Sequence, residues 1–185
     1  MKILRIVTGG ALEAFILGKL LRPHLGEAVR VYIDEGGGAA PVSSARSWLA
    51  DGKPVALVLN TGTLSFGKIR NHMARLESLL GMVAFRDRWK IVLWRPEVEI
   101  LFFYDVEILR QLVGREATEE ELTRAQAHPK QVLAELLGVQ PKDLLPELRR
   151  RLDSIDLRPL AAHPQIRALL EFHAPRRPET WLISP

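Results

Sequence analysis

Val55–Phe66, VALVLNTGTLSF, runs from an apolar segment directly into a short polar loop. The segment Val55–Leu59 is apolar on both faces of the expected strand, which is typical of a strand buried inside a parallel sheet. The loop Asn60–Thr63 follows at once, with Gly62 among its polar residues. Ligands of open parallel sheets bind beyond the carboxyl ends of the strands. We therefore predict a central parallel strand at Val55–Asn60 that ends at a candidate site.

Segments of similar character recur along the first part of the chain. Short apolar and β-branched runs predict strands, and apolar residues at helical spacing predict helices. The expected strands are Ile3–Val7, Val29–Ile33 and Lys90–Trp94, and the expected helices are Ala11–Leu25, Val42–Ala50 and Ile69–Val83. This alternation predicts an α/β fold with a mainly parallel β-sheet and helices on both faces.

The segment after the fourth expected strand is a further helix candidate. Pro96 stands where a helix would start, and Glu97 would then lie in its first turn. The helical pattern continues to Gly114, although its first half also alternates as a strand would.

Beyond Gly114 the pattern changes to short, Pro-punctuated helices. Their expected starts are Thr118, His128, Pro141 and Pro159, and TWLIS (Thr180–Ser184) is a candidate edge strand. We therefore expect an α/β core at residues 1–114 and a helical C-terminal extension, packed on that core, at residues 115–185.

Composition narrows the class of protein. The chain has 185 residues, 47% of them hydrophobic and 26% charged, which suits one compact domain with a real core. It has no cysteine, so disulfides and thiolate metal sites are excluded. We expect no membrane span, because no apolar run approaches the roughly 18 residues required. The N-terminus reads as a strand and not as a signal peptide, so the expected compartment is the cytoplasm.

Positive charge is concentrated on one expected helix and the segment after it. The formal net charge is +4, and the candidate nucleic-acid-binding residues are Lys68, Arg75, Arg86 and Arg88. Lys68, His72 and Arg75 share the helix face opposite its apolar stripe. The alternative interpretation of these charges is the solvated back of an amphipathic helix.

Several common catalytic and cofactor motifs are missing. The dinucleotide-binding fingerprint would put glycines at Gly9, Ala11 and Ala14 with an acid at Asp34, and two of these glycines are absent. The glycines after Asp34 lack the Lys-Ser/Thr ending of a P-loop. Histidines occur in no metal-binding spacing, and no nucleophile elbow is present. We therefore expect no nucleotide cofactor and no conventional hydrolase triad.

Four stretches carry a resemblance to a known family: RIVTGGALEAFILGKLL (Arg5–Leu21), GGGAAPVSSARSWL (Gly36–Leu49), PVALVLNTGT (Pro54–Thr63) and RPEVEILFFYD (Arg95–Asp105). In order and spacing they resemble TOPRIM-like domains, in the small form related to OLD-type nucleases. That family has a first strand followed by Glu-Gly and an acid-bearing helix, an apolar strand ending in Asp-x-Asp, and a later Pro-x-x-Glu segment. The resemblance covers Lys2–Val113 and implies a TOPRIM-like α/β core.

The departures from the family pattern concern its metal ligands. The family's first glutamate falls on Thr8, and its two aspartates fall on Asn60 and Gly62. In the family these acids hold Mg²⁺, which requires carboxylate oxygens that Thr, Asn and Gly do not supply. The resemblance thus implies a degenerate acidic site with no bound metal.

Some carboxylates remain near the matched positions. Glu13 matches the acid-bearing first helical turn and Glu99 the later glutamate, while Asp34 and Asp105 are further candidates for catalytic carboxylates. Glu13 and Glu99 also have a purely structural interpretation, because a helix dipole favours an acid in the first turn.

The resemblance and the charge pattern together lead to three functional hypotheses. The first is a non-catalytic nucleic-acid-binding protein or partner subunit in a DNA-related or defence system. The alternative is a Mg²⁺- or Mn²⁺-dependent nuclease rebuilt from Glu13, Glu99 and either Asp34 or Asp105. The third is a protein–protein interaction module that uses the helical C-terminal third. Only the nuclease requires a metal, and a protein partner or a homo-oligomer remains an option under the others.

Overall fold

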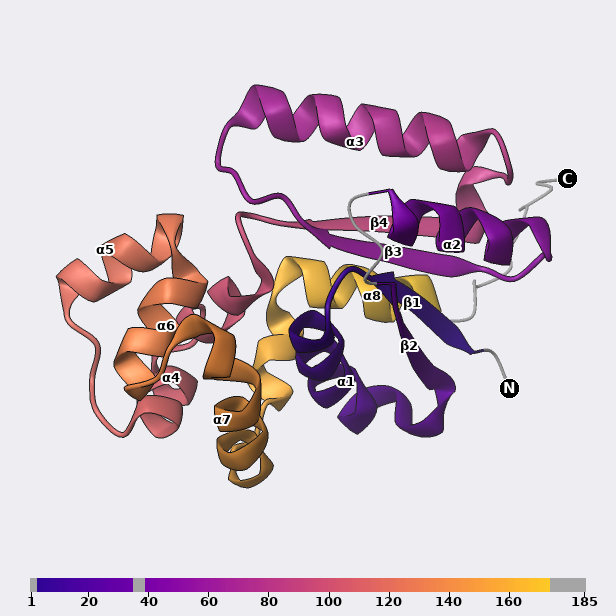
Figure 1. The fold of residues 1–185 in the computed structure, drawn as a ribbon. Coiled ribbons are helices and arrows are strands. Elements are labelled where there is room, and N and C mark those ends of the chain that lie inside the picture. The colour runs from indigo at the N-terminus through magenta and orange to yellow at the C-terminus, as the bar shows by residue number, and fades with distance from the viewer. Residues whose placement is uncertain (1–2, 35–38, 174–185) are drawn as a thin grey trace, which may run out of the picture.

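The computed structural model describes residues 3–34 and 39–173, and these form an α/β fold around a four-stranded, all-parallel sheet (Figure 1). The strands are β1 (Leu4–Thr8), β2 (Val29–Ile33), β3 (Val55–Asn60) and β4 (Trp89–Trp94), in the order β2-β1-β3-β4. The predicted fold class is confirmed.

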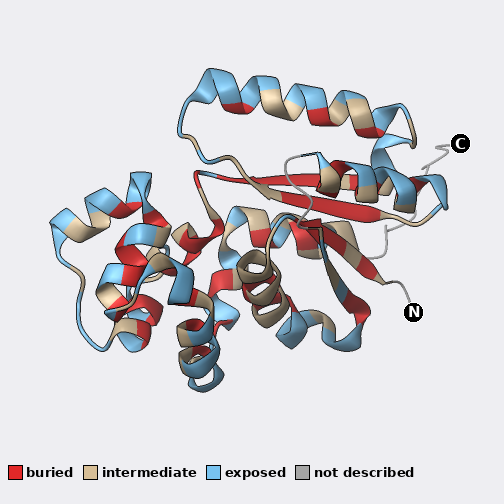
Figure 2. Cartoon of the chain, in the orientation of Figure 1, coloured by how far each residue is buried: buried red, intermediate tan, exposed pale blue. Residues whose placement is uncertain are grey.

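Strand β3 is central, as its apolar sequence predicts. It pairs with β1, where Val7 lies opposite Leu57, and with β4, where Leu57 lies opposite Ile91. Its first four residues are buried, and burial decreases only at its carboxyl end (Figure 2). Strands β2 and β4 form the two edges of the sheet.

Helices cover both faces of the sheet. Helices α2 (Ala40–Ala50) and α3 (Phe66–Gly81) lie on one face, and α1 (Ala11–Leu25) and α8 (Pro164–His173) lie on the other (Figure 1). Strand side chains alternate between the two faces, so Leu57 joins the buried cluster under α2 and α3, whereas Val58 joins the cluster under α1 and α8. Two short 3₁₀ helices, η1 (Gly26–Ala28) and η2 (Arg86–Arg88), lead into β2 and β4.

The segment after β4 corrects the prediction of one continuous helix. It forms a 3₁₀ helix, η3 (Val98–Phe103), and a separate α-helix, α4 (Val106–Val113). Pro96 starts no helix, because the first helical residue is Val98 and Glu97 is the N-terminal cap of η3. The reason is tertiary: loop residues beyond β3 bond to this segment, and they hold its start away from a regular α-helix.

The C-terminal segment consists of short helices: α5 (Glu119–Ala127), α6 (Pro129–Leu137), η4 (Pro141–Asp143), α7 (Leu144–Arg151), η5 (Leu152–Ser154), η6 (Arg158–Ala162) and α8. The predicted starts at Thr118 and His128 are confirmed as the caps of α5 and α6. Pro141 begins η4, directly before α7, and Pro159 lies within η6. The candidate strand Thr180–Ser184 lies outside the described residues.

The C-terminal helices share a hydrophobic core with the sheet. The buried cluster on the α1 face includes Ile16 and Val58 from the first part of the chain and Leu133, Leu148 and Leu169 from the last part. Among the residues described, no helix is both long and apolar enough to cross a membrane.

Candidate functional site

The side chain of Asn60 joins three segments at the carboxyl end of β3. Its Nδ2 donates a hydrogen bond to Oε1 of Glu13 in α1, at 2.6 Å. Its Oδ1 accepts a hydrogen bond from the main-chain N–H of Val98 in η3, at 3.0 Å. The next loop residues continue the connection, because the N–H of Gly62 donates to the Pro96 carbonyl at 3.0 Å. The Asn60 amide therefore links β3 to α1 and to η3, and both its Nδ2 and its Oδ1 form hydrogen bonds.

Glu13 folds back over the start of α1. A Cβ atom placed on Gly10, the N-terminal cap residue, would lie only 2.3 Å from Oε2 of Glu13. Glycine at this position therefore makes room for the carboxylate, which lies where the helix dipole favours negative charge. The TGGALEA sequence thus serves to position an acid beside Asn60.

Glu99 is the most unusual charged residue of the site. It is 1% exposed, and neither of its carboxylate oxygens has a hydrogen-bond partner from another described residue. The pKa of Glu99 is raised to about 7, mainly by burial and to a smaller extent by the Glu97 and Glu13 carboxylates, while its own main-chain N–H and Lys130 act in the opposite direction. Its place in the first turn of η3 is confirmed, but only the structure reveals its burial.

The three positions at which the resemblance would place metal ligands, Thr8, Asn60 and Gly62, carry no carboxylate. Thr8 is fully buried, and its hydroxyl has no hydrogen-bond partner within the described ranges. Gly62 has a φ of +60°, and the Asn60 amide is already bonded to Glu13 and Val98. The described residues contain no group of three or more metal-ligating side chains.

Asp34 and Asp105 contact other parts of the structure. The Ser44 hydroxyl donates a hydrogen bond to the Asp34 carboxylate, which ties the end of β2 to α2. Oδ1 of Asp105 accepts hydrogen bonds from the N–H groups of Glu107 and Ile108, each at 3.0 Å. Asp105 is thus the N-terminal cap of α4, and the geometry indicates a structural role for it.

Replacing Asp105 with alanine is expected to lower the free energy of unfolding by about 1 kcal/mol, because two N–H groups of α4 lose their acceptor. Asp105→Asn is the matched control, since asparagine caps helices almost as well and should cost only a few tenths of a kcal/mol. Urea unfolding of the three proteins measures the difference. Equal losses in the two variants would mean that the charge of Asp105 matters and not its capping bond.

The basic residues predicted to bind nucleic acid divide into two places. The Arg86 guanidinium stacks over Trp89 and pairs with Glu77, and Arg88 donates a hydrogen bond to the Gly52 carbonyl. These two side chains connect η2 to α3, to the start of β4 and to the turn at Gly52. The other two predicted residues lie on α3 and not on η2. Both Arg75 and Lys68 are exposed there, and Lys68 lies in the first turn of the helix.

Arg75 contributes to a hollow of about 410 Å³ between α2 and α3. The lining residues are Ala39, Val42, Ser43, Arg46, His72, Arg75, Leu76 and Leu79. Arg46 was not among the predicted residues, because the proximity of α2 to α3 follows from packing and not from local sequence. We refer to Arg46, His72 and Arg75 as the basic hollow.

Comparison with known proteins identifies no relative: no protein-family model, no curated protein and no solved structure matches this chain.

Proposed function

We propose that this chain is a TOPRIM-like protein with a degenerate acidic site, and that it acts without catalysis by binding nucleic-acid phosphates at the basic hollow. In this role it would be the nucleic-acid-binding or partner subunit of a DNA-related or defence system. The observation that carries the proposal is the convergence of Arg46, His72 and Arg75 on one hollow whose lining residues include no acid.

The charges of the basic hollow are available to a ligand. Arg46 and Arg75 are exposed, and neither forms an ion pair with any residue that the structure describes. Arg86 differs, because Glu77 already compensates its charge. Guanidinium groups bind phosphate oxygens with two parallel hydrogen bonds, so two unpaired arginines at one hollow suit a phosphodiester backbone.

The apolar part of the lining supports the same conclusion. Val42, Leu76 and Leu79 form walls of low dielectric constant beside the charged groups. A cleft with charges of one sign and apolar walls concentrates the electric field and attracts counter-ions. On binding, the arginines would displace the small cations that otherwise neutralise the phosphates of the nucleic acid, and this release is the usual driving force of such binding.

The nuclease hypothesis has one observation in its favour, namely that the Glu13 carboxylate contributes to the raised pKa of Glu99, although less than burial and Glu97 do. Mg²⁺ in proteins is usually bound through one or two carboxylates, with waters and substrate phosphates as its other ligands. Asp34 and Asp105, the other candidates, bond to Ser44 and to the start of α4. We therefore place the non-catalytic function first and the nuclease second.

Binding to single- or double-stranded oligonucleotides tests the proposal. We expect weak, sequence-tolerant binding at about 50 mM salt that falls steeply as salt rises, because each neutralised phosphate releases counter-ions. The double variant Arg46→Glu, Arg75→Glu should lower the affinity at least about tenfold and reduce the slope of log K against log salt by about 1 to 2. Fluorescence anisotropy over a salt series measures both quantities.

The matched control is Arg22→Glu with Lys142→Glu, which makes the same change in net charge at two exposed positions outside the basic hollow. This control should retain most of the affinity. Equal losses in the two double variants would assign the binding to overall charge. No detectable binding of the parent at low salt would reject the proposal in favour of an interaction module.

A further inference from the structure

Within residues 3–34 and 39–173, no strand pairs with the outer side of β4, which we call the open edge. The N–H of Thr61 donates to the Trp94 carbonyl at 3.0 Å, so the main chain of Trp94 faces β3. Main-chain groups of alternate residues point to opposite sides of a strand. The main chain of Trp89, Ile91 and Leu93 therefore faces away from β3, toward the side of the sheet where no described strand lies.

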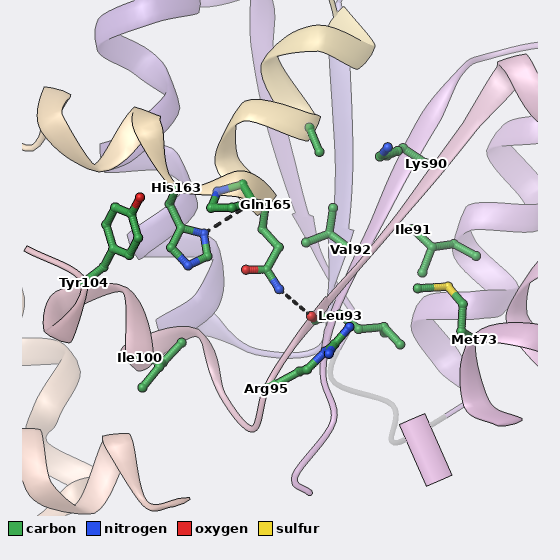
Figure 3. Close-up of a pocket in the computed structure, with 12 residues that line it drawn as sticks. Met73, Lys90, Ile91, Val92, Leu93, Arg95, Ile100, Tyr104, His163 and Gln165 are labelled. Atoms are coloured by element: carbon green, nitrogen blue, oxygen red, sulfur yellow. Dashed lines mark hydrogen bonds between the residues drawn. The ribbon is translucent and has the colours of Figure 1, made fainter. Parts of the chain in front are cut away.

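Two carbonyls on this open edge are covered by side chains. Arg86 donates to the Trp89 carbonyl at 3.2 Å, and Nε2 of Gln165 donates to the Leu93 carbonyl at 2.8 Å (Figure 3). Between them, the N–H and C=O of Ile91 and the N–H of Leu93 face outward. Unpaired main-chain groups of an edge strand are a template for pairing with another chain.

A hollow of about 600 Å³ lies along the same edge (Figure 3). Its apolar lining is Met73, Ile91, Val92, Leu93, Ile100, Pro164 and Ala168. Side chains from both faces of β4 contribute, since Ile91 and Val92 point to opposite faces of the sheet. The hollow therefore follows the strand edge, with space for side chains on either side of an added strand.

The charge of this hollow has one sign. Lys90 and Arg95 contribute to the lining, which contains no Asp or Glu, and neither cation has an acidic partner in the described part of the chain. His163, whose ring lies 4.8 Å from the Tyr104 ring, is half-buried, and burial lowers its pKa. The two cations are five positions apart in sequence and lie near the two ends of the open edge.

We propose that the open edge of β4 binds an extended peptide segment of a partner protein, which adds a strand to the sheet beside Ile91 and Leu93. Along the bound segment, apolar side chains would alternate with polar ones, and the apolar side chains would fill the hollow. The segment would also carry carboxylates that face Lys90 and Arg95. Main-chain hydrogen bonds supply affinity in this binding mode, and the pockets for alternate side chains supply specificity. This site is distinct from the basic hollow, so the inference does not depend on the proposed function.

A labelled peptide tests the proposal with the full chain. The probe has about six residues, the usual length of a strand, alternates valine with threonine, and carries aspartate at each end. We expect saturable binding by fluorescence anisotropy. Two N-methylated versions of the probe block alternate sets of amides, and only one of them should lose binding, because only one set faces β4.

Variants of the chain locate the binding. Lys90→Glu with Arg95→Glu should weaken binding of the probe at least about tenfold, since both complementary charges are reversed. Arg46→Glu with Arg75→Glu makes the same charge change at the basic hollow and should leave the affinity within about twofold. A loss in both variants, or equal binding of both N-methylated probes, would overturn the proposal. Failure of the probe to bind would also overturn the proposal.

Discussion

Replacing Asn60 with aspartate is expected to lower the free energy of unfolding at pH 8 by about 3 kcal/mol. The new carboxylate keeps an acceptor for the N–H of Val98, but it replaces the donor that bonds Glu13 at 2.6 Å. A charged hydrogen bond is lost and two negative charges are brought together. Urea unfolding at several pH values measures the effect.

The pH dependence of this variant has a definite sign. The neighbouring charge raises the pKa of the new carboxyl group in the folded state above its unfolded value. The destabilisation is therefore absent below about pH 4 and grows as the pH rises toward the folded pKa. Asn60→Ala is the matched control, because it removes both hydrogen bonds without adding a charge. Its stability relative to the parent should change little between pH 5 and pH 8, within about 0.5 kcal/mol.

The effect of divalent cations on the melting temperature distinguishes the degenerate-site hypothesis from the nuclease hypothesis. Mg²⁺ or Mn²⁺ at millimolar concentration should raise the melting temperature of Asn60→Asp, because two adjacent carboxylates suffice for a weak cation site and only the folded state presents it. The parent should show no saturable response. A saturable rise in the parent that Glu13→Ala or Glu99→Ala abolishes would favour the nuclease hypothesis. A variant that folds without any cation response would mean that Asn60 does not correspond to the family's metal-binding aspartate.

Replacing Glu99 with glutamine is expected to remove a fall in stability that the parent undergoes between pH 4.5 and pH 7. In this window the folded parent keeps a proton that the unfolded chain has lost, because the pKa of Glu99 is raised from 4.5 to about 7. Unfolding then releases a proton, so the free energy of unfolding falls as the pH rises. The fall amounts to about 3 kcal/mol in total and ends above pH 7, where both states are ionised.

The difference between Glu99→Gln and the parent should therefore change by about 2.5 kcal/mol from pH 5 to pH 8, in favour of the variant at pH 8. Glutamine keeps the size of the side chain and remains uncharged throughout, so the comparison isolates the ionisation. Glu97→Gln is the control, because it removes a nearby carboxylate that contributes less to the pKa of Glu99 than burial does. Parallel pH profiles of the parent and Glu99→Gln would contradict the raised pKa.

Local sequence patterns predicted most of the regular elements. Strand β3 was predicted because its apolar residues leave no face for solvent, and α3 because Ile69, Leu76 and Leu80 recur at helical spacing and are all buried. The second half of the predicted continuous helix does form an α-helix, Val106–Val113, but the prediction of one continuous helix was wrong between Glu97 and Asp105. There a hydrogen bond from Val98 to Asn60, 38 positions away, competes with the local preference for a continuous helix.

The candidate site was predictable only in outline. Because the carboxyl ends of parallel strands meet at one edge of the sheet, Thr8 and Asn60 were expected near each other. The partner of Asn60, the burial of Glu99 and the contribution of Arg46 to the basic hollow had no local signal. Asp105 directly before α4 is the exception, since an aspartate that precedes an apolar helical run is a typical N-terminal cap.

The amino-acid sequence by itself determined the α/β class, the number of strands in the described core, their order along the chain and the apolar face of each element. Hydrophobic periodicity is a property of neighbouring residues, and therefore it is present in the sequence itself. Tertiary structure alone decided that β4 is an edge strand, that Asn60 bonds Glu13 and that Glu99 is buried. These features depend on distances between side chains of different elements, and packing sets those distances only when the helices close over the sheet.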